Sequence, residues 1–135
     1  MPGTASQHDA EGRHLLVTLP GCARPSLDDV AAIERVVRRA AAATGAHVLQ
    51  VISHHFEPHG VTALALLAES HASLHTYPEA GVVFWDCFTC GAECDPRRSV
   101  AILVEALQPQ VIEEEEIARS ANPTHGPTRQ AMPAG

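Results

Sequence analysis

Residues 54–91 read HHFEPHGVTALALLAESHASLHTYPEAGVVFWDCFTCG, and this stretch decides the fold. It contains three segments with the apolar and β-branched character of strands, at 61–68, 72–76 and 82–89. The first two are separated by Glu69-Ser70-His71, and a turn that contains Pro and Gly precedes the third. The stretch therefore predicts three consecutive strands with short connections.

The flanking sequence adds two helices and further strands. Residues 27–44 carry apolar side chains at helical spacing, with Ser26 as the predicted N-cap and a stop at Gly45. A second helix is predicted to open at Asp95-Pro96 and to run through Leu107. The remaining predicted strands are 14–19, 47–56 and 111–117.

This element order, β-α-β-β-β-α-β, indicates an α+β fold. The natural solution is a two-layer sandwich, in which two helices cover one face of an antiparallel β-sheet. The other face would stay partly open and could pair with a second copy of the chain. A chain of 135 residues suits one domain, which we assign to 13–119, with 1–12 and 120–135 as disordered tails.

Composition excludes several classes of function. The N-terminus has no basic start followed by an apolar stretch, and no apolar run approaches the roughly 20 residues of a membrane helix. We therefore expect a cytoplasmic protein that neither inserts into membranes nor binds nucleic acid, since its net charge is −7. The sequence contains no lysine, which rules out a lysine Schiff base and so conventional pyridoxal-phosphate chemistry.

The four cysteines are Cys22, Cys87, Cys90 and Cys94. Cys87 and Cys90 form a C-x-x-C, but they lie in a segment with strand character, where residues three apart point to opposite faces. They are therefore not expected to hold one ion together, and we expect no metal site.

Ser70 follows the end of the apolar run ALALLA, and the simplest structural interpretation of such a serine is a turn residue. His75 lies five residues further on, and Cys90 ends the next predicted strand. A hydroxyl, an imidazole and a thiol could thus converge at strand ends, although spacing alone indicates no more than that possibility.

The segment LLAESHASLHTYPEAG, followed by DCFTCG, resembles the processing and catalytic region of bacterial S-adenosylmethionine decarboxylases. The resemblance continues upstream through HLLVTLPGC (14–22), AAAATGAHVL (40–49) and HHFEPHGVT (54–62). It covers about residues 13–107. It implies an enzyme that decarboxylates S-adenosylmethionine to supply the aminopropyl donor for spermidine biosynthesis.

The resemblance also implies a pyruvoyl cofactor made by self-cleavage between Glu69 and Ser70. The Ser70 oxygen would attack the preceding carbonyl to give an ester. Elimination and loss of ammonia would then leave a pyruvoyl group at the start of an α chain, 70–135, with 1–69 as the β chain. The pyruvoyl ketone would form a Schiff base with the substrate amine.

Three further residues match family positions in this chemistry. His75 matches the histidine that assists processing by proton transfer, and Thr62 falls where the family has a processing hydroxyl, often Ser. Cys90 matches the thiol that returns a proton to the substrate α-carbon. The alternatives are a hydrogen-bonded sheet histidine, a plain strand threonine and a buried structural cysteine.

Substrate recognition by resemblance involves Phe56 and Tyr77 stacking on adenine, and Glu79 holding the ribose hydroxyls. Ordinary core packing is the alternative for both aromatic residues. In the family such sites combine residues of two protomers, which implies a homodimer.

Some positions depart from the family pattern. Tyr77 replaces the usual Trp, Thr18 and Pro20 replace acidic and aromatic residues, and Phe84-Trp85 replaces a small pair. An arginine or ornithine decarboxylase with the same cofactor is therefore the alternative function. A non-catalytic dimeric homologue is a third interpretation.

Overall fold

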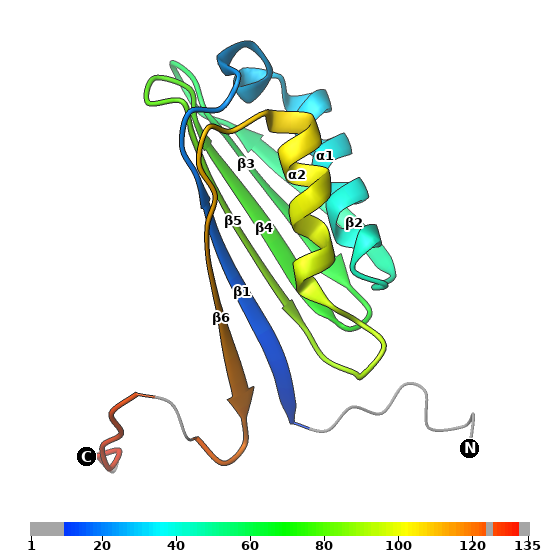
Figure 1. The fold of residues 1–135 in the computed structure, drawn as a ribbon, viewed down its shortest axis with the longest axis vertical. Helices are drawn as coiled ribbons and strands as arrows, with labels where there is room; N and C mark the ends of the chain where they lie inside the picture. The colour runs from blue at the N-terminus through cyan, green and yellow to red at the C-terminus, as the bar shows by residue number, and fades with distance from the viewer. Residues whose placement is uncertain (1–9, 124–125, 133–135) are drawn as a thin grey trace.

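The computed structural model describes residues 10–123 and 126–132, which form a six-stranded sheet and two helices (Figure 1). The strands are β1 (Glu11–Leu19), β2 (Val48–His55), β3 (Val61–Leu67), β4 (Ser70–Tyr77), β5 (Val82–Thr89) and β6 (Glu113–Ser120). The helices are α1 (Val30–Ala43) and α2 (Ser99–Leu107), each preceded by a short 3-10 turn. Within this part of the chain, no helix is long and apolar enough to span a membrane.

The sheet is antiparallel throughout, in the order β2-β3-β4-β5-β1-β6. Both helices lie on the same face of it, as Figure 1 shows. The predicted α+β fold, with two helices over one face of an antiparallel sheet, is confirmed. The strand pairs that matter for the site join Thr62 to His75, Ser73 to Asp86 and Ser70 to Thr89.

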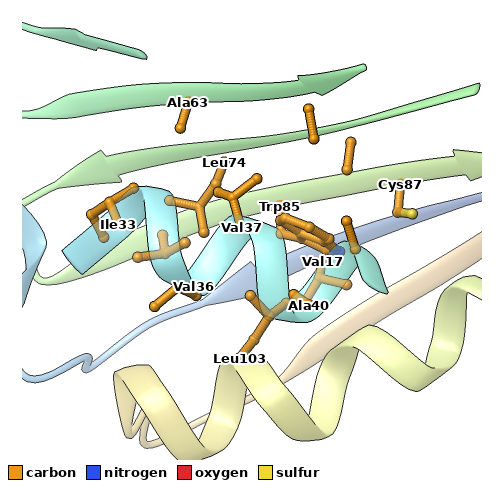
Figure 2. Packing of buried hydrophobic residues seen from close by; sticks show 14 of the residues in the cluster. Val17, Ile33, Val36, Val37, Ala40, Ala63, Leu74, Trp85, Cys87 and Leu103 are labelled. Atoms are coloured by element: carbon orange, nitrogen blue, oxygen red, sulfur yellow. The ribbon is translucent and has the colours of Figure 1, made fainter. Parts of the chain in front are cut away.

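The core lies between the helices and the sheet. Helix α1 contributes Ile33, Val37 and Ala40 at helical spacing, and Leu103 of α2 joins them (Figure 2). Trp85 lies at the centre of this layer and is 1% exposed. Its indole N–H donates to the Ser99 hydroxyl at 3.0 Å, so the bulky side chain is buried with its polar atom satisfied.

The ends of several elements differ from those predicted. The N-cap of α1 is Asp29, whose carboxylate accepts from the Ala32 N–H at 3.1 Å, so the prediction of Ser26 was wrong. Strand β4 is longer than predicted and begins at Ser70 itself. β1 begins at Glu11, inside the predicted N-terminal tail, and β6 includes Ser120. Much of the predicted tails (1–9, 124–125 and 133–135) lies outside the described residues.

The Asp29 cap gives a prediction about stability. Asp29→Ala should lower the free energy of unfolding by about 1 kcal/mol, because an N–H at the start of α1 loses its acceptor. Asp29→Ser, which keeps a capping oxygen, should retain most of that stability. Urea unfolding at equal protein concentration measures both variants. Equal losses in the two would show that the side-chain cap is not the cause.

Candidate active site

One end of the sheet brings Glu69, Ser70 and Cys90 together. The Cys90 backbone N–H donates to the Glu69 carbonyl oxygen at 3.1 Å, which ties the end of β5 to the turn between β3 and β4. Ser70 has a φ of +155°, which a residue with a side chain rarely adopts. The backbone of Ser70 is therefore strained directly after the Glu69–Ser70 peptide bond, and the carbonyl oxygen of that bond already accepts a hydrogen bond.

His47 fixes the Glu69 side chain. The carboxylate of Glu69 accepts from the His47 backbone N–H at 2.9 Å and lies 2.8 Å from the His47 Nδ1. Burial acts to raise the pKa of Glu69, but the hydrogen bonds from His47 outweigh it and hold that pKa below its usual value. Glu69 is thus an anchored carboxylate next to the strained backbone of Ser70.

A pocket of about 290 Å³ opens at the other end of β3 and β4. It is lined by Phe56, His59, Gly60, Thr62, His75, Thr76, Tyr77 and Glu79. Phe56 and Tyr77 are 46% and 42% exposed, so core packing does not explain either aromatic residue. The structure thus gathers all three residues expected to bind substrate at one pocket, together with Thr62 and His75.

The two regions are far apart within one chain. Ser70 and His75 lie five residues apart on the same strand, which corresponds to about 16 Å. Within a single chain, the end of β5 before Cys90 lies beside Ser70, whereas His75 lies well away from both.

The open face of the sheet carries a hydrogen-bonded network that sequence reasoning missed. Asp86 pairs with His14 at 2.7 Å (Nε2 to Oδ2) and accepts from the Ser73 hydroxyl. The Ser73 oxygen lies 3.4 Å from the His75 Nε2, and the Thr62 oxygen lies 2.9 Å from the His75 Nδ1. The sequence did contain a sign of this network, because Asp86 interrupts the otherwise apolar strand VVFWDCFT. A half-buried carboxylate in a sheet needs hydrogen-bond partners.

His14, His71 and Asp86 also form a set whose potential ligand atoms lie within 4.8 Å of one another. Two imidazoles and a carboxylate are donors that a divalent transition metal accepts. In the structure, however, Asp86 already accepts hydrogen bonds from His14 and Ser73. We therefore interpret this set as part of the hydrogen-bonded network.

The cysteines divide by burial. Cys22, Cys87 and Cys94 are buried, whereas Cys90 is partly exposed, and all four are free thiols. Burial raises the pKa of Cys87 to about 12, so its thiol stays protonated and unreactive. Cys87 points into the core and Cys90 follows the end of β5, so the C-x-x-C pair does not face one site.

Apolar side chains surround the network on the open face. Leu16, Ile52, Leu64, Leu66 and Phe84 are each 38–53% exposed there. Phe84 and Thr18 also line a second hollow of about 350 Å³ beside His75 and Asp86. Exposed apolar residues clustered in this way are typical of an interaction surface or a ligand-binding groove.

Asp86 gives a prediction about acid stability. Burial acts to raise its pKa, but the hydrogen bonds from Ser73 and His14 hold that pKa below the usual 3.8. Such a carboxylate stabilises the fold above its unfolded-state pKa, and this contribution is lost as the pH falls through the folded-state pKa. Asp86→Asn should therefore unfold at lower urea than the parent at neutral pH, and the difference should shrink as the pH falls below the unfolded-state pKa of the carboxyl. A difference that persists equally in acid would mean that Asp86 acts by packing alone.

Comparisons with known proteins identify a family for the chain. A family model described as S-adenosylmethionine decarboxylase matches residues 13–120. An S-adenosylmethionine decarboxylase proenzyme 2 from Bacillus cereus is 40% identical over 113 residues, covering 84% of this chain and 92% of the relative. An S-adenosylmethionine decarboxylase proenzyme from Prochlorococcus marinus is 46% identical over 97 residues, covering 72% of this chain and 80% of the relative.

A solved structure shows the same fold. The crystal structure of the adenosylmethionine decarboxylase from Aquifex aeolicus superposes with a TM-score of 0.76 at 28% identity, and the match covers 89% of this chain and 99% of that one. The family model spans most of the chain, and relatives of 40% identity and above match over most of their own length. The chain therefore belongs to the S-adenosylmethionine decarboxylase family.

Proposed function

We propose that this chain is a self-cleaving, pyruvoyl-dependent decarboxylase that converts S-adenosylmethionine to decarboxylated S-adenosylmethionine, the aminopropyl donor for spermidine synthesis. The observation that carries the proposal is the backbone geometry around the Glu69–Ser70 peptide bond. Ser70 has a positive φ, and the carbonyl oxygen of Glu69 accepts from the Cys90 N–H. The relatives that match the chain are named as proenzymes, which agrees with a chain that is cut after synthesis.

Self-cleavage begins when the Ser70 oxygen attacks the Glu69 carbonyl carbon. Negative charge then develops on the Glu69 carbonyl oxygen, where the Cys90 N–H is already placed to stabilise it. The C–N bond breaks and leaves an ester between Glu69 and the Ser70 side chain. Elimination releases the Glu69 carboxylate and leaves dehydroalanine, which takes up water and loses ammonia. Relief of the strained Ser70 conformation favours the first step.

The pyruvoyl group formed at Ser70 supplies the carbonyl that accepts the electrons left when CO₂ departs. The residues around it suit that cofactor, since Ser70 provides its atoms and Cys90 lies beside it with a partly exposed thiol. We assign Cys90 as the proton donor to the substrate α-carbon. Its exposure distinguishes it from Cys87, which is buried in the core.

The pocket lined by Phe56, Tyr77 and Glu79 is our proposed nucleoside site. Two exposed aromatic side chains at one pocket suit a flat purine, and stacking on each is worth roughly 1–3 kcal/mol. Glu79 has an exposed carboxylate, 3.4 Å from the His59 Nε2, and a carboxylate can accept from both ribose hydroxyls.

We further propose that the enzyme is a homodimer in which the open faces of two sheets pair. The exposed apolar residues of that face support this arrangement. The separation of Ser70 from His75 supports it independently, because Ser70 of one protomer can then meet Thr62 and His75 of its partner. The dimer completes a site that one chain leaves divided between two ends of its sheet.

Complementation between two inactive chains tests cleavage and the dimer together. Ser70→Ala lacks the attacking oxygen, and His75→Ala should mature about 10²–10⁴-fold more slowly for want of the proton-transfer group. When the two are coexpressed, the His75→Ala chain should be cut, because its Ser70 faces the intact His75 of the other chain. Mass spectrometry of differently tagged chains gives the measurement, since each fragment is about half of 14.3 kDa.

A chain with both substitutions is the matched control, and when it is coexpressed with the His75→Ala chain it should leave that chain uncut. If the His75→Ala chain remains uncut in the mixture while the parent is cut normally, His75 does not act across a dimer. A parent chain that never cleaves would refute the proposed maturation itself.

Substrate assignment depends on Tyr77. Tyr77→Ala should weaken kcat/KM for S-adenosylmethionine by about 1–3 kcal/mol, because one stacking face is lost, whereas Tyr77→Trp keeps that face. Neither change should slow self-cleavage, which involves no substrate. Assays of CO₂ release on S-adenosylmethionine, arginine and ornithine, run side by side, provide the measurement. CO₂ release from arginine or ornithine, with none from S-adenosylmethionine, would refute the substrate assignment and leave the pyruvoyl chemistry in place.

A further inference from the structure

Four strands contribute to one chain of hydrogen bonds on the open face. It runs from Thr62 on β3 to His75 and Ser73 on β4, then to Asp86 on β5 and His14 on β1. Strand register produces it, since Thr62 pairs with His75 and Ser73 pairs with Asp86. Ser73 and His75, two residues apart on β4, point to the same face.

The direction of each hydrogen bond in this series is set by the Asp86 carboxylate, because that group can only accept. An ionised carboxylate can only accept, so the Ser73 hydroxyl donates to Asp86. The Ser73 oxygen keeps its lone pairs free, and the contact at 3.4 Å therefore requires a proton on the His75 Nε2. In the neutral ring, Nδ1 is then the acceptor, and it receives the Thr62 hydroxyl at 2.9 Å.

Asp86 is itself well held. Its Oδ2 accepts from the His14 Nε2 at 2.7 Å and lies 3.5 Å from the His71 Nε2, while its Oδ1 accepts from Ser73. Ser73 is 7% exposed, so water has little access to replace it in the chain. The acceptor that sets the direction of the network is therefore fixed by donors from two neighbouring strands.

We propose that Asp86 and Ser73 are positioning residues that hold His75 as its Nε2–H tautomer. The proton-accepting atom of His75 is then Nδ1, and it works through the Thr62 hydroxyl during self-cleavage. This inference rests on the proposed self-cleavage for its function, but the tautomer is a property of the uncleaved chain. It also explains why a half-buried carboxylate faces the open side of the sheet.

The tautomer can be measured without activity. In ¹⁵N-labelled Ser70→Ala chain, a long-range ¹H–¹⁵N correlation spectrum should show His75 as the Nε2–H form, with its Nε2 proton protected from exchange. The chain has nine histidines, so His75→Gln in the same background assigns the signal. Ser73→Ala should lose the protected proton, because its acceptor is gone, and Ser73→Thr should keep it. A His75 found as the Nδ1–H form, or a proton unaffected by Ser73→Ala, would overturn the proposal.

Cleavage kinetics test the consequence. In chains with an intact Ser70, Ser73→Ala should slow maturation by up to about 10²-fold, at the low end of what positioned acid–base groups contribute. Ser73→Thr should restore most of the rate. Ser53→Ala is a matched control, since that serine also donates to a carboxylate, Glu34, but lies on the helix-facing side of β2. It should mature at the parent rate.

Equal slowing by Ser53→Ala and Ser73→Ala would indicate a general loss of stability and count against a positioning role. If Ser73→Ala fails to fold, Asp86→Ala, which removes the acceptor of the Ser73 hydroxyl, takes its place in both experiments. That variant should lose the protected His75 proton and mature slowly, and parent-like behaviour in both would refute the role of Asp86. A parent chain that stays intact would instead refute self-cleavage and leave the tautomer result standing.

Discussion

Burial of one face of the sheet beneath α1 and α2 governs what the other face can display. Side chains alternate along a strand, so every residue that packs under a helix places its neighbours on the open side. Leu74 is fully buried between Ser73 and His75, and Trp85 is buried next to Asp86. A shift of one residue in register would put Asp86 in the core and remove Trp85 from it. The packing of the core therefore also fixes the geometry of the polar network.

Strand length divides the chemistry between two places. The strained Ser70 backbone and the Cys90 N–H lie at one end of the sheet, after the turn that follows β3 and at the end of β5. The pocket and His75 lie toward the other end. A strand is stiff and its length is set by its residue count, so no side-chain movement closes that distance within one chain. The proposed face-to-face pairing of two sheets would bring the two halves together.

How much of this was predictable varies with the feature. Strand 82–89 was predicted at its observed bounds, because its apolar pattern lies between clear turn residues. The N-cap of α1 was not predicted correctly, because Ser26, Asp28 and Asp29 are all suitable capping residues. The choice depends on the tertiary structure, in which Asp28 instead accepts from the Gly60 N–H at 2.7 Å. Likewise, spacing raised Ser70, His75 and Cys90 only as a possibility, and their roles came from the resemblance to the family. Neither could show which strand ends meet, and Ser73 and Asp86 became visible only once strand register was known.

The strand order has a consequence for the cut protein. Strands β1, β2 and β3 precede the Glu69–Ser70 bond, and β4, β5 and β6 follow it, yet β1 lies between β5 and β6. The two pieces would thus interlock: one inserts a strand into the sheet of the other, and each supplies one helix to a shared core. Loss of the peptide link removes a tether without opening the sheet, so the pieces stay associated until a central strand is extracted. Once separated, they could reassemble only by a second-order reaction, and the stability of the mature protein would depend on its concentration.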